Sequence, residues 1–409
     1  MNRKGCVPFV IGIAGVIIAV LVWGFMMGSL PPILFGVAQS ISIDGGAKGA
    51  DGAIGMVMDE NDILYTTGFI TTPGQGKDIW LAKFDQDLNM LINATINSAV
   101  NGDDVGYALL LGENDSLYLI GYISQPDTGR DIFLAKINRT DLSIVKNLTV
   151  NGLDNSTDEG YEMIFNEYNN NLYIVGTVQE PNEGYNIYIG KFDTNFNLIK
   201  NITLNGPANG TDRGRFLVFD DASNLYVSGS KSREGTGCDL WLGKFNTNLT
   251  LLDEIIVASS TTGEDEGYGL LYDGVDTIYI TGTLFHNSQG NNIFLAKYDT
   301  SLNQLQNVTI NGPANAEDIG YTLILDENGG LFQAGVYSEN AGGANVWIAE
   351  FNTNLDIILQ DTFDGLSHGY DTSYDIISTE GHDLFVSGFL NTPSESTNIW
   401  IARYSMAFI

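Results

Sequence analysis

Apolar runs recur along the chain at a nearly constant interval. An eight-residue run that begins at Asp78 (DIWLAKFD) returns in related form six more times, with starts at residues 131, 186, 239, 292, 345 and 398. The intervals between successive starts are 53 or 55 residues. A period near 50 residues that holds several short apolar runs is typical of a repeat protein whose units stack on one another.

Each repeat contains four short runs that predict strands. In the unit 104–152, apolar runs at 108–111, 117–121 and 132–137 are separated by polar turns, and an alternating run at 144–151 follows. Nearly continuous apolar runs predict strands that are covered on both faces. The fourth run alternates Asn and Thr with Leu and Val, which predicts a half-exposed outermost strand. Four strands joined by short turns predict an antiparallel meander.

Seven such units predict an all-β fold, a seven-bladed β-propeller of four-stranded antiparallel blades. The last unit ends at Ile409 without a fourth strand, whereas an unmatched strand of the fourth type stands at 38–45. We therefore expect the N-terminal strand to complete the last blade and close the ring, which leaves no open sheet edge. The N-terminal linker would then leave from the face that carries the turns between third and fourth strands. The opposite face would point outward.

The N-terminus predicts a membrane anchor. Arg3 and Lys4 precede an uncharged, apolar run from Val7 to Met27, which matches the roughly 20 residues that cross a bilayer as a helix. Positive residues before such a run predict a cytoplasmic N-terminus. We therefore expect a single-pass membrane protein with an extracellular propeller. Its expected parts are a cytoplasmic stub at 1–6, a transmembrane helix at 7–27, a linker at 28–37 and the propeller at 38–409.

Two alternatives for the N-terminus stay open. Gly36-Val37-Ala38 is a small-residue sequence of the kind that is cut in secreted proteins. Arg3-Lys4-Gly5 before an apolar run resembles the processing site of archaeal type IV pilin-like proteins, which are cut after the Gly and pack their helix into a filament. The uncleaved anchor remains our main expectation.

The composition narrows the classes of partner. A net charge of -32, from 18 Lys+Arg and 50 Asp+Glu, excludes a nucleic-acid partner, because phosphates need cationic side chains. An acidic surface keeps the chain soluble and attracts cations. Adaptation to high salt is a weaker interpretation, because the chain is rich in Ile, Asn and large aromatic residues. Cys6 and Cys238 would lie on opposite sides of a membrane, so we expect no intrachain disulfide.

Asn-x-Ser/Thr sequences follow the apolar run and support an extracellular glycoprotein. Four of them fall on predicted outermost strands, where glycans would also hinder strand pairing between molecules. Some are expected by chance in a chain rich in Asn and Thr. The glycosylation candidates are Asn93, Asn114, Asn138, Asn147, Asn155, Asn201, Asn209, Asn248 and Asn307.

One repeat carries a resemblance to a known family. The sequence NGDDVGY from Asn101, NDSLYLIGY from Asn114 and DIFLAK from Asp131 resembles the SBBP-type β-propeller repeat of secreted bacterial and archaeal proteins. The resemblance covers residues 38–409 and implies the propeller fold. It implies no catalytic residues, because members of the family are mostly uncharacterised surface or secreted proteins. Blade four departs from the pattern at Arg213–Phe216, where Gly-Tyr is usual, and blades one and seven are also irregular.

One Asp precedes the first strand of every blade, near the expected outer face and central channel. A ring of carboxylates can hold Ca²⁺, so calcium is the one cofactor candidate. The favoured interpretation is structural, with each Asp accepting hydrogen bonds from loop N–H groups. No D-x-D-x-D-G calcium loop is present. The metal candidates are Asp51, Asp104, Asp158, Asp212, Asp265, Asp318 and Asp371.

Tyrosines and unrepeated cations are further candidates. Tyr107, Tyr161, Tyr268, Tyr321 and Tyr374 follow the repeated Asp, and they can line the channel and stack on sugars, although packing between blades is favoured. Four cations cluster on blade four and are candidates for binding an acidic glycan or a partner's carboxylates. Alternatively, they compensate a locally acidic surface. These binding candidates are Arg213, Arg215, Lys231 and Arg233.

The motifs favour a binding module over an enzyme. The sequence has no Gly-x-Ser-x-Gly, no phosphate-binding loop and no zinc-like His or Cys spacing. We expect a non-enzymatic adhesion or binding module for a protein or glycan at the cell surface, with specificity set by the loops between second and third strands. Those loops are predicted at 69–77, 122–130, 177–185, 230–238, 283–291, 336–344 and 389–397.

Two other functions stay open. The chain is alternatively a self-associating subunit of a surface layer or pilus-like filament. A carbohydrate-active enzyme with its site in the channel is the weaker alternative, because nothing in the sequence singles out a carboxylate pair for glycoside cleavage.

Overall fold

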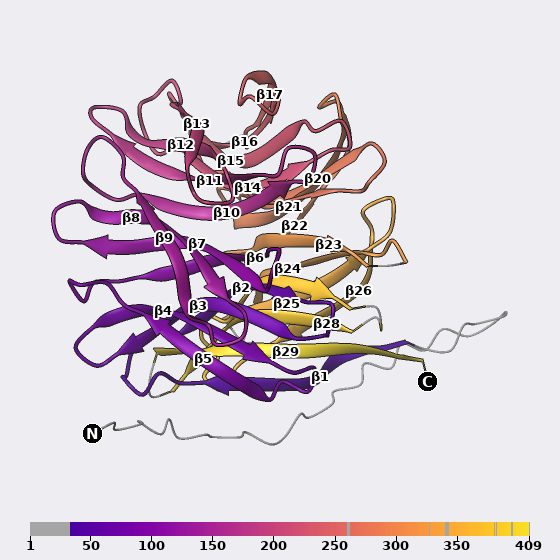
Figure 1. The fold of residues 1–409 in the computed structure, drawn as a ribbon. Coiled ribbons are helices and arrows are strands. Elements are labelled where there is room, and N and C mark those ends of the chain that lie inside the picture. Colours follow the sequence, from indigo (N-terminus) through magenta and orange to yellow (C-terminus); the bar gives the residue numbers. More distant parts are fainter. Residues whose placement is uncertain are drawn as a thin grey trace, which may run out of the picture.

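The computed structural model describes residues 33–259, 262–326, 328–339, 343–379, 381, 383–393 and 396–408. Seven sheets, each containing four antiparallel strands, are arranged around a central axis (Figure 1). The prediction of an all-β, seven-bladed propeller is therefore confirmed. The described residues contain no helix, and so none that is long and apolar enough to cross a bilayer. The predicted stub at 1–6 and helix at 7–27 lie outside the described residues.

The strands follow one another in the order of the repeats. Blade one consists of β2 (Gly52–Met58), β3 (Leu64–Thr72), β4 (Gly76–Phe84) and β5 (Met90–Ile96). Blade two consists of β6 (Val105–Leu111), β7 (Ser116–Gln125), β8 (Gly129–Asn138) and β9 (Ile144–Val150). Blade three consists of β10 (Glu159–Asn166), β11 (Asn171–Glu180), β12 (Gly184–Phe192) and β13 (Leu198–Leu204). Blade four consists of β14 (Arg213–Phe219), β15 (Leu225–Arg233), β16 (Gly237–Phe245) and β17 (Leu251–Val257), with β18 (Gly263–Glu264) added beside β16.

The remaining blades repeat this order. Blade five consists of β19 (Glu266–Tyr272), β20 (Thr277–His286), β21 (Gly290–Asp299) and β22 (Gln304–Ile310). Blade six consists of β23 (Ile319–Leu325), β24 (Leu331–Glu339), β25 (Gly343–Phe351) and β26 (Ile357–Phe363). Blade seven contains β27 (Thr372–Ser378), β28 (Leu384–Thr392), β29 (Ser396–Phe408) and β1 (Ile33–Ile43).

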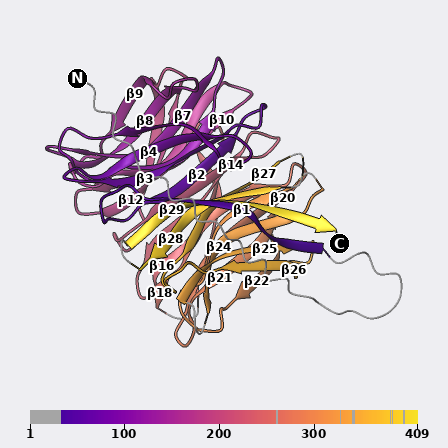
Figure 2. The same ribbon diagram turned by 90° about the horizontal axis from the view of Figure 1, so that it is seen from below.

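The first and last described strands lie side by side (Figure 2). β1 pairs antiparallel with β29, from Ile43 opposite Ile399 to Ile33 opposite Phe408. Residues 33–37, which we expected to belong to the linker, form the start of β1. The pairing partner explains the difference, because β29 continues to Phe408 and offers backbone groups along that whole length.

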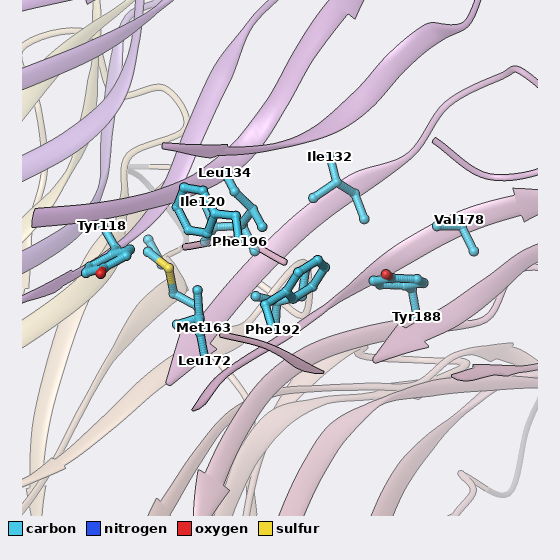
Figure 3. Packing of buried hydrophobic residues seen from close by; sticks show 12 residues of the cluster. Tyr118, Ile120, Ile132, Leu134, Met163, Leu172, Val178, Tyr188, Phe192 and Phe196 are labelled. Atoms are coloured by element: carbon cyan, nitrogen blue, oxygen red, sulfur yellow. The ribbon is translucent and has the colours of Figure 1, made fainter. Parts of the chain in front are cut away.

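Apolar side chains fill the spaces between neighbouring blades. Between blades two and three, Ile120 and Leu134 face Met163, Leu172 and Phe192 in one buried cluster (Figure 3). Burying a side chain of this kind stabilises a protein by about 1.5–3 kcal/mol. Each blade therefore obtains much of its stability from its neighbours, as expected for a repeat fold.

The outermost strands are half exposed, as their alternation predicts. On β5, Leu91, Asn93 and Thr95 are exposed, whereas Ile92 and Ala94 are partly buried against the sheet. Among the nine Asn-x-Ser/Thr sites, Asn138 is the partly buried one, and its Oδ1 accepts a hydrogen bond from Thr140 N at 2.8 Å. The exposed sites are Asn93, Asn114, Asn147, Asn155, Asn201, Asn209, Asn248 and Asn307.

Most residues of the predicted specificity loops belong to strands instead. The second and third strands of each blade continue into tight hairpins, with Thr72 paired to Gly76 in blade one and Gln125 paired to Gly129 in blade two. The glycines explain this, because Gly76 and Gly129 have φ angles of 82° and 75°, which side-chain-bearing residues rarely adopt. The turns between Thr72 and Gly76 and between Gln125 and Gly129 are consequently short.

Candidate functional site

A bulge in every innermost strand points one side chain into the central channel. In β6, Gly106 pairs with Gly121 and Ala108 pairs with Ile120, so Tyr107 has no partner across the ladder. A β-bulge bends the strand and redirects the side chain of its extra residue. The same register shift occurs in all seven blades. The bulge residues that line the central cavity are Ile54, Tyr107, Tyr161, Arg215, Tyr268, Tyr321 and Tyr374.

The tyrosines form two arcs that Arg215 connects. Ring centroids lie 5.0 Å apart for Tyr107 and Tyr161 and also for Tyr268 and Tyr321. The guanidinium of Arg215 lies over Tyr161 at 4.3 Å and over Tyr268 at 5.3 Å, where blade four has no tyrosine of its own. The tyrosines therefore pack against one another between blades and also line the channel.

The buried carboxylate of Glu266 interacts with both Arg215 and Arg213. Glu266 accepts a hydrogen bond from Arg215 Nε at 2.7 Å and lies 3.8 Å from Arg213 Nη1. Burial alone would raise the pKa of Glu266, but the charges of Arg215 and Arg213 hold that pKa below its ordinary value. Glu266 is thus ionised and orients Arg215 over the tyrosines.

The central cavity has a volume of about 690 Å³ and contains two carboxyl groups from opposite parts of the sequence. Asp375 accepts hydrogen bonds from Met56 N at 2.8 Å and from Ile376 N at 2.9 Å, and Glu162 accepts one from Met163 N at 2.9 Å. Burial raises the pKa of Glu162 to about 8, with a contribution from the charge of Asp375, and burial raises the pKa of Asp375 to about 7. Near neutral pH Glu162 therefore exists largely as a carboxylic acid that can donate a hydrogen bond, and Asp375 is protonated in about half of the molecules.

Sequence reasoning missed Glu162 and Asp375, although the repeat contains a signal for them. Both follow the bulge residue directly, and at this position the other blades have Gly, Ala, Phe or Thr. A carboxyl side chain at a position that is apolar or small in the other blades is not needed for the architecture that all blades share. Carboxyl groups with strongly shifted pKa values in a cavity are candidates for ligand binding or catalysis.

The repeated aspartates have structural contacts. Asp104 is fully buried, its Oδ2 accepts from Ser98 N at 2.6 Å and its Oδ1 accepts from Ser124 N at 2.7 Å. Its own N–H donates to Lys77 O of the preceding blade at 2.7 Å. The described residues contain no group of three or more His, Cys, Asp or Glu side chains that could hold a metal ion. The same pair of backbone N–H donors is found at Asp51, Asp158, Asp212, Asp265, Asp318 and Asp371.

The four predicted binding cations do not form one cluster. Arg213 and Arg215 lie on β14, with Arg215 at the central cavity, whereas Lys231 and Arg233 lie on β15. Lys231 pairs with Glu254 and lies 4.7 Å from the Trp241 ring, and Arg233 pairs with Asp239 at 3.0 Å. Local pairing therefore satisfies the charges of both Lys231 and Arg233.

Cys238 is on a strand rather than in the predicted loop. It is 8% exposed on β16, and its Sγ donates to Thr211 O at 3.1 Å. Burial raises the pKa of this thiol to about 11. The thiol is therefore protonated near neutral pH and is a poor nucleophile.

The chain matches no known family model and no curated protein. Solved structures share its fold. A protein of unknown function from Dyadobacter fermentans has 11% identity and a TM-score of 0.52, with 91% of this chain and 99% of that chain covered. Sqt1 of Chaetomium thermophilum, solved with the N-terminus of ribosomal protein L10, has 11% identity and a TM-score of 0.50, with coverage of 87% and 98%. Semaphorin 1b of Drosophila has 6% identity and a TM-score of 0.50, with coverage of 90% and 87%. At such identities the likeness shows the propeller fold alone.

Proposed function

We propose that this chain is a non-enzymatic binding module at the cell surface and that it binds a glycan at the outer mouth of the central channel. The observation that carries this proposal is the 690 Å³ cavity, whose wall combines six tyrosines with two carboxyl groups that no other blade repeats. Tyrosine rings offer flat apolar faces to a sugar ring. A few well-placed polar groups in a mostly apolar cavity give orientation and specificity.

The hydroxyl groups of a sugar match the polar groups of this cavity. A protonated carboxyl at Glu162 or Asp375 can donate one hydrogen bond and accept another, as each sugar hydroxyl also can. A site built to bond hydroxyl groups strongly rejects analogues that lack them, because its buried polar groups then stay unpaired. The outer turns are short, so we assign specificity to the channel rather than to variable loops.

The cellular setting belongs to the same proposal. Residues 7–27 would anchor the chain in the membrane, with the propeller outside, and Arg3 and Lys4 before that run support this orientation. Eight exposed Asn-x-Ser/Thr sites are consistent with a glycosylated ectodomain. We further propose that β1 closes the ring and that the chain is related to the SBBP-type propellers.

A second candidate function is glycoside hydrolysis in the channel. The pair Glu162 and Asp375 favours it, because most glycosidases use two carboxyl groups, one of them protonated as a general acid. Release of products from a bound glycan would identify the enzyme, whereas stable binding without products supports the binding module.

A glycan array with the full chain in detergent tests the proposal. We expect the wild type to bind a defined set of glycans and Tyr374→Leu, which removes a ring of the channel wall, to weaken binding about tenfold. Tyr168→Leu is the matched control, because this tyrosine is 76% exposed and does not line the channel. Absence of glycan binding, or equal binding by both variants, would refute the proposal.

A further inference from the structure

A second cavity of about 250 Å³ adjoins the central channel, and Tyr161 lines both. Three blades build this cavity. Arg130 comes from β8 of blade two, Thr177 and Tyr185 come from β11 and β12 of blade three, and Arg213 comes from β14 of blade four. The complete lining is Arg130, Thr157, Glu159, Tyr161, Thr177, Tyr185 and Arg213.

A small side chain in blade three leaves room for this cavity. The residue after the glycine of each second strand is aromatic at Phe69, Tyr122 and Phe389, and these three rings line the wall of the central cavity. Blade three has Thr177 at this position, opposite Glu159 in the ladder. A threonine is much smaller than a tyrosine, so space remains beside the channel in blade three.

The hydroxyl group of Thr177 is a buried polar group that a ligand could bind. Thr177 is 3% exposed, and its Oγ1 is buried without a hydrogen-bond partner among the described residues. A buried hydroxyl without a partner destabilises a protein. A ligand atom that accepted or donated a hydrogen bond here would remove that cost.

Arg213 provides unused donors, whereas Arg130 lies between two carboxylates, with its Nη2 3.5 Å from Asp103 Oδ2. Arg130 Nη1 lies 3.1 Å from Glu159 Oε1, and the other oxygen of Glu159 accepts from Tyr161 Oη at 2.7 Å, so this carboxylate is fully engaged. Within the described ranges, the one ion pair of Arg213 is with Glu266 at 3.8 Å, beyond hydrogen-bond distance, and Arg215 already holds that carboxylate. Arg213 therefore keeps most of its five N–H donors free for an anion.

We propose that this cavity binds the anionic group, a carboxylate or a sulfate, of an acidic sugar whose ring lies against Tyr161. Arg213 and Arg130 would bind the anionic oxygens, and the Thr177 hydroxyl would donate to one of them. The sugar would continue into the central channel through the shared Tyr161. This inference rests on the proposed function and adds the class of ligand, an acidic glycan.

Calorimetric titration of the full chain with a hexamer of galacturonate and with its carboxyl-reduced, neutral form tests this inference. We expect the acidic hexamer to bind at least about tenfold more tightly. Thr177→Tyr fills the cavity with the residue that blade two has at this position, and it should remove the preference while the neutral hexamer binds as before. Arg213→Gln should act in the same way. Thr283→Tyr, at the equivalent position of blade five, is the control and should keep the preference.

A second readout separates this inference from the proposed function. Sodium sulfate alone should shift the methyl resonance of Thr177 in the wild type and leave it unchanged in Arg213→Gln. Equal affinity for both hexamers, without a sulfate shift, would overturn the anion site while leaving glycan binding intact. A sulfate shift without binding of any oligosaccharide would keep the anion site and refute the glycan. Tighter binding of a poly-aspartate peptide than of the acidic hexamer would overturn the assignment to a sugar.

Discussion

The carboxylate of Asp104 joins two backbone segments that the sequence separates widely. One oxygen holds Ser98 in the approach to the strand, and the other holds Ser124 at the end of the second strand. Its presence in every blade made a structural role predictable from the sequence. The partners were not predictable, because the residue 20 positions later comes close only once the hairpin has formed.

Replacing this carboxylate should destabilise the protein. Asp104→Asn places an amide where two backbone N–H groups need acceptors, so we expect the free energy of unfolding to fall by about 2–4 kcal/mol. Urea unfolding measures this change. Asp115→Asn is the control, because Asp115 is an exposed partner of Arg139, and such pairs contribute about 1 kcal/mol or less. An equal loss in both variants would argue against the structural role. A calcium-dependent rise in melting temperature that Asp104→Asn abolishes would support the calcium site instead.

The two channel acids should make stability depend on pH. Their folded pKa values of about 8 for Glu162 and about 7 for Asp375 exceed the ordinary values near 4, so the folded protein holds protons that the unfolded chain releases. Stability should therefore fall as pH rises from about 4 to about 8. Melting temperatures across this range measure the effect. The double variant Glu162→Gln/Asp375→Asn should show a flatter profile, and an unchanged profile would contradict these pKa shifts.

At the scale of elements, the pattern of apolar and polar residues predicts the strands but does not predict how they pair with one another. The alternation from Asn147 to Val150 identified an outermost strand, because side-chain direction alternates locally along a strand. The bulge at Tyr107 has no such local signal, since it arises from a mismatch with β7. Pro126 and Gly129 predict a break between the second and third strands of blade two, but they do not show how many residues the connecting turn contains.

Loss of β1 should weaken the propeller. The chain 44–409 lacks the strand that pairs with β29, which leaves apolar Trp400 and Ile401 beside an open sheet edge. We expect it to melt about 5 °C or more below the chain 33–409 and to aggregate on size-exclusion chromatography. Equal melting temperatures for the two chains would contradict the proposal that β1 closes the ring.

At the scale of the whole molecule, the candidate site exists only because blades far apart in the sequence surround one channel. Glu162 and Asp375 are more than 200 residues apart in the sequence, and the channel is what brings them to one cavity. Sequence reasoning identified the tyrosines from the repeat and Arg215 as a cation that the other blades do not repeat. It gave too little weight to positions where one or two blades differ from the rest, such as Glu162 and Asp375, and these positions distinguish the site from the shared architecture.

The N-terminus of the protein from its native membranes tests the proposed anchor. We expect intact mass and N-terminal sequencing to show a start at Met1, with added glycan mass on the exposed Asn-x-Ser/Thr sites. A start at Cys6 would support a filament subunit, and a start near Gln39 would mean a released protein. A wholly unmodified chain would contradict the predicted glycosylation.

The most direct test of the central claim is a calorimetric titration, at pH 7, of the best glycan from the array into the wild type, Glu162→Gln and Glu162→Leu. Because the Glu162 carboxyl is largely protonated at this pH, Gln can replace its hydrogen bonds, whereas Leu keeps the bulk and makes none. We predict saturable binding without product release, affinity within about threefold for Gln, and about a tenfold or greater loss for Leu. Equal affinity in all three proteins, or conversion of the glycan to products, would contradict a non-enzymatic glycan site in the channel.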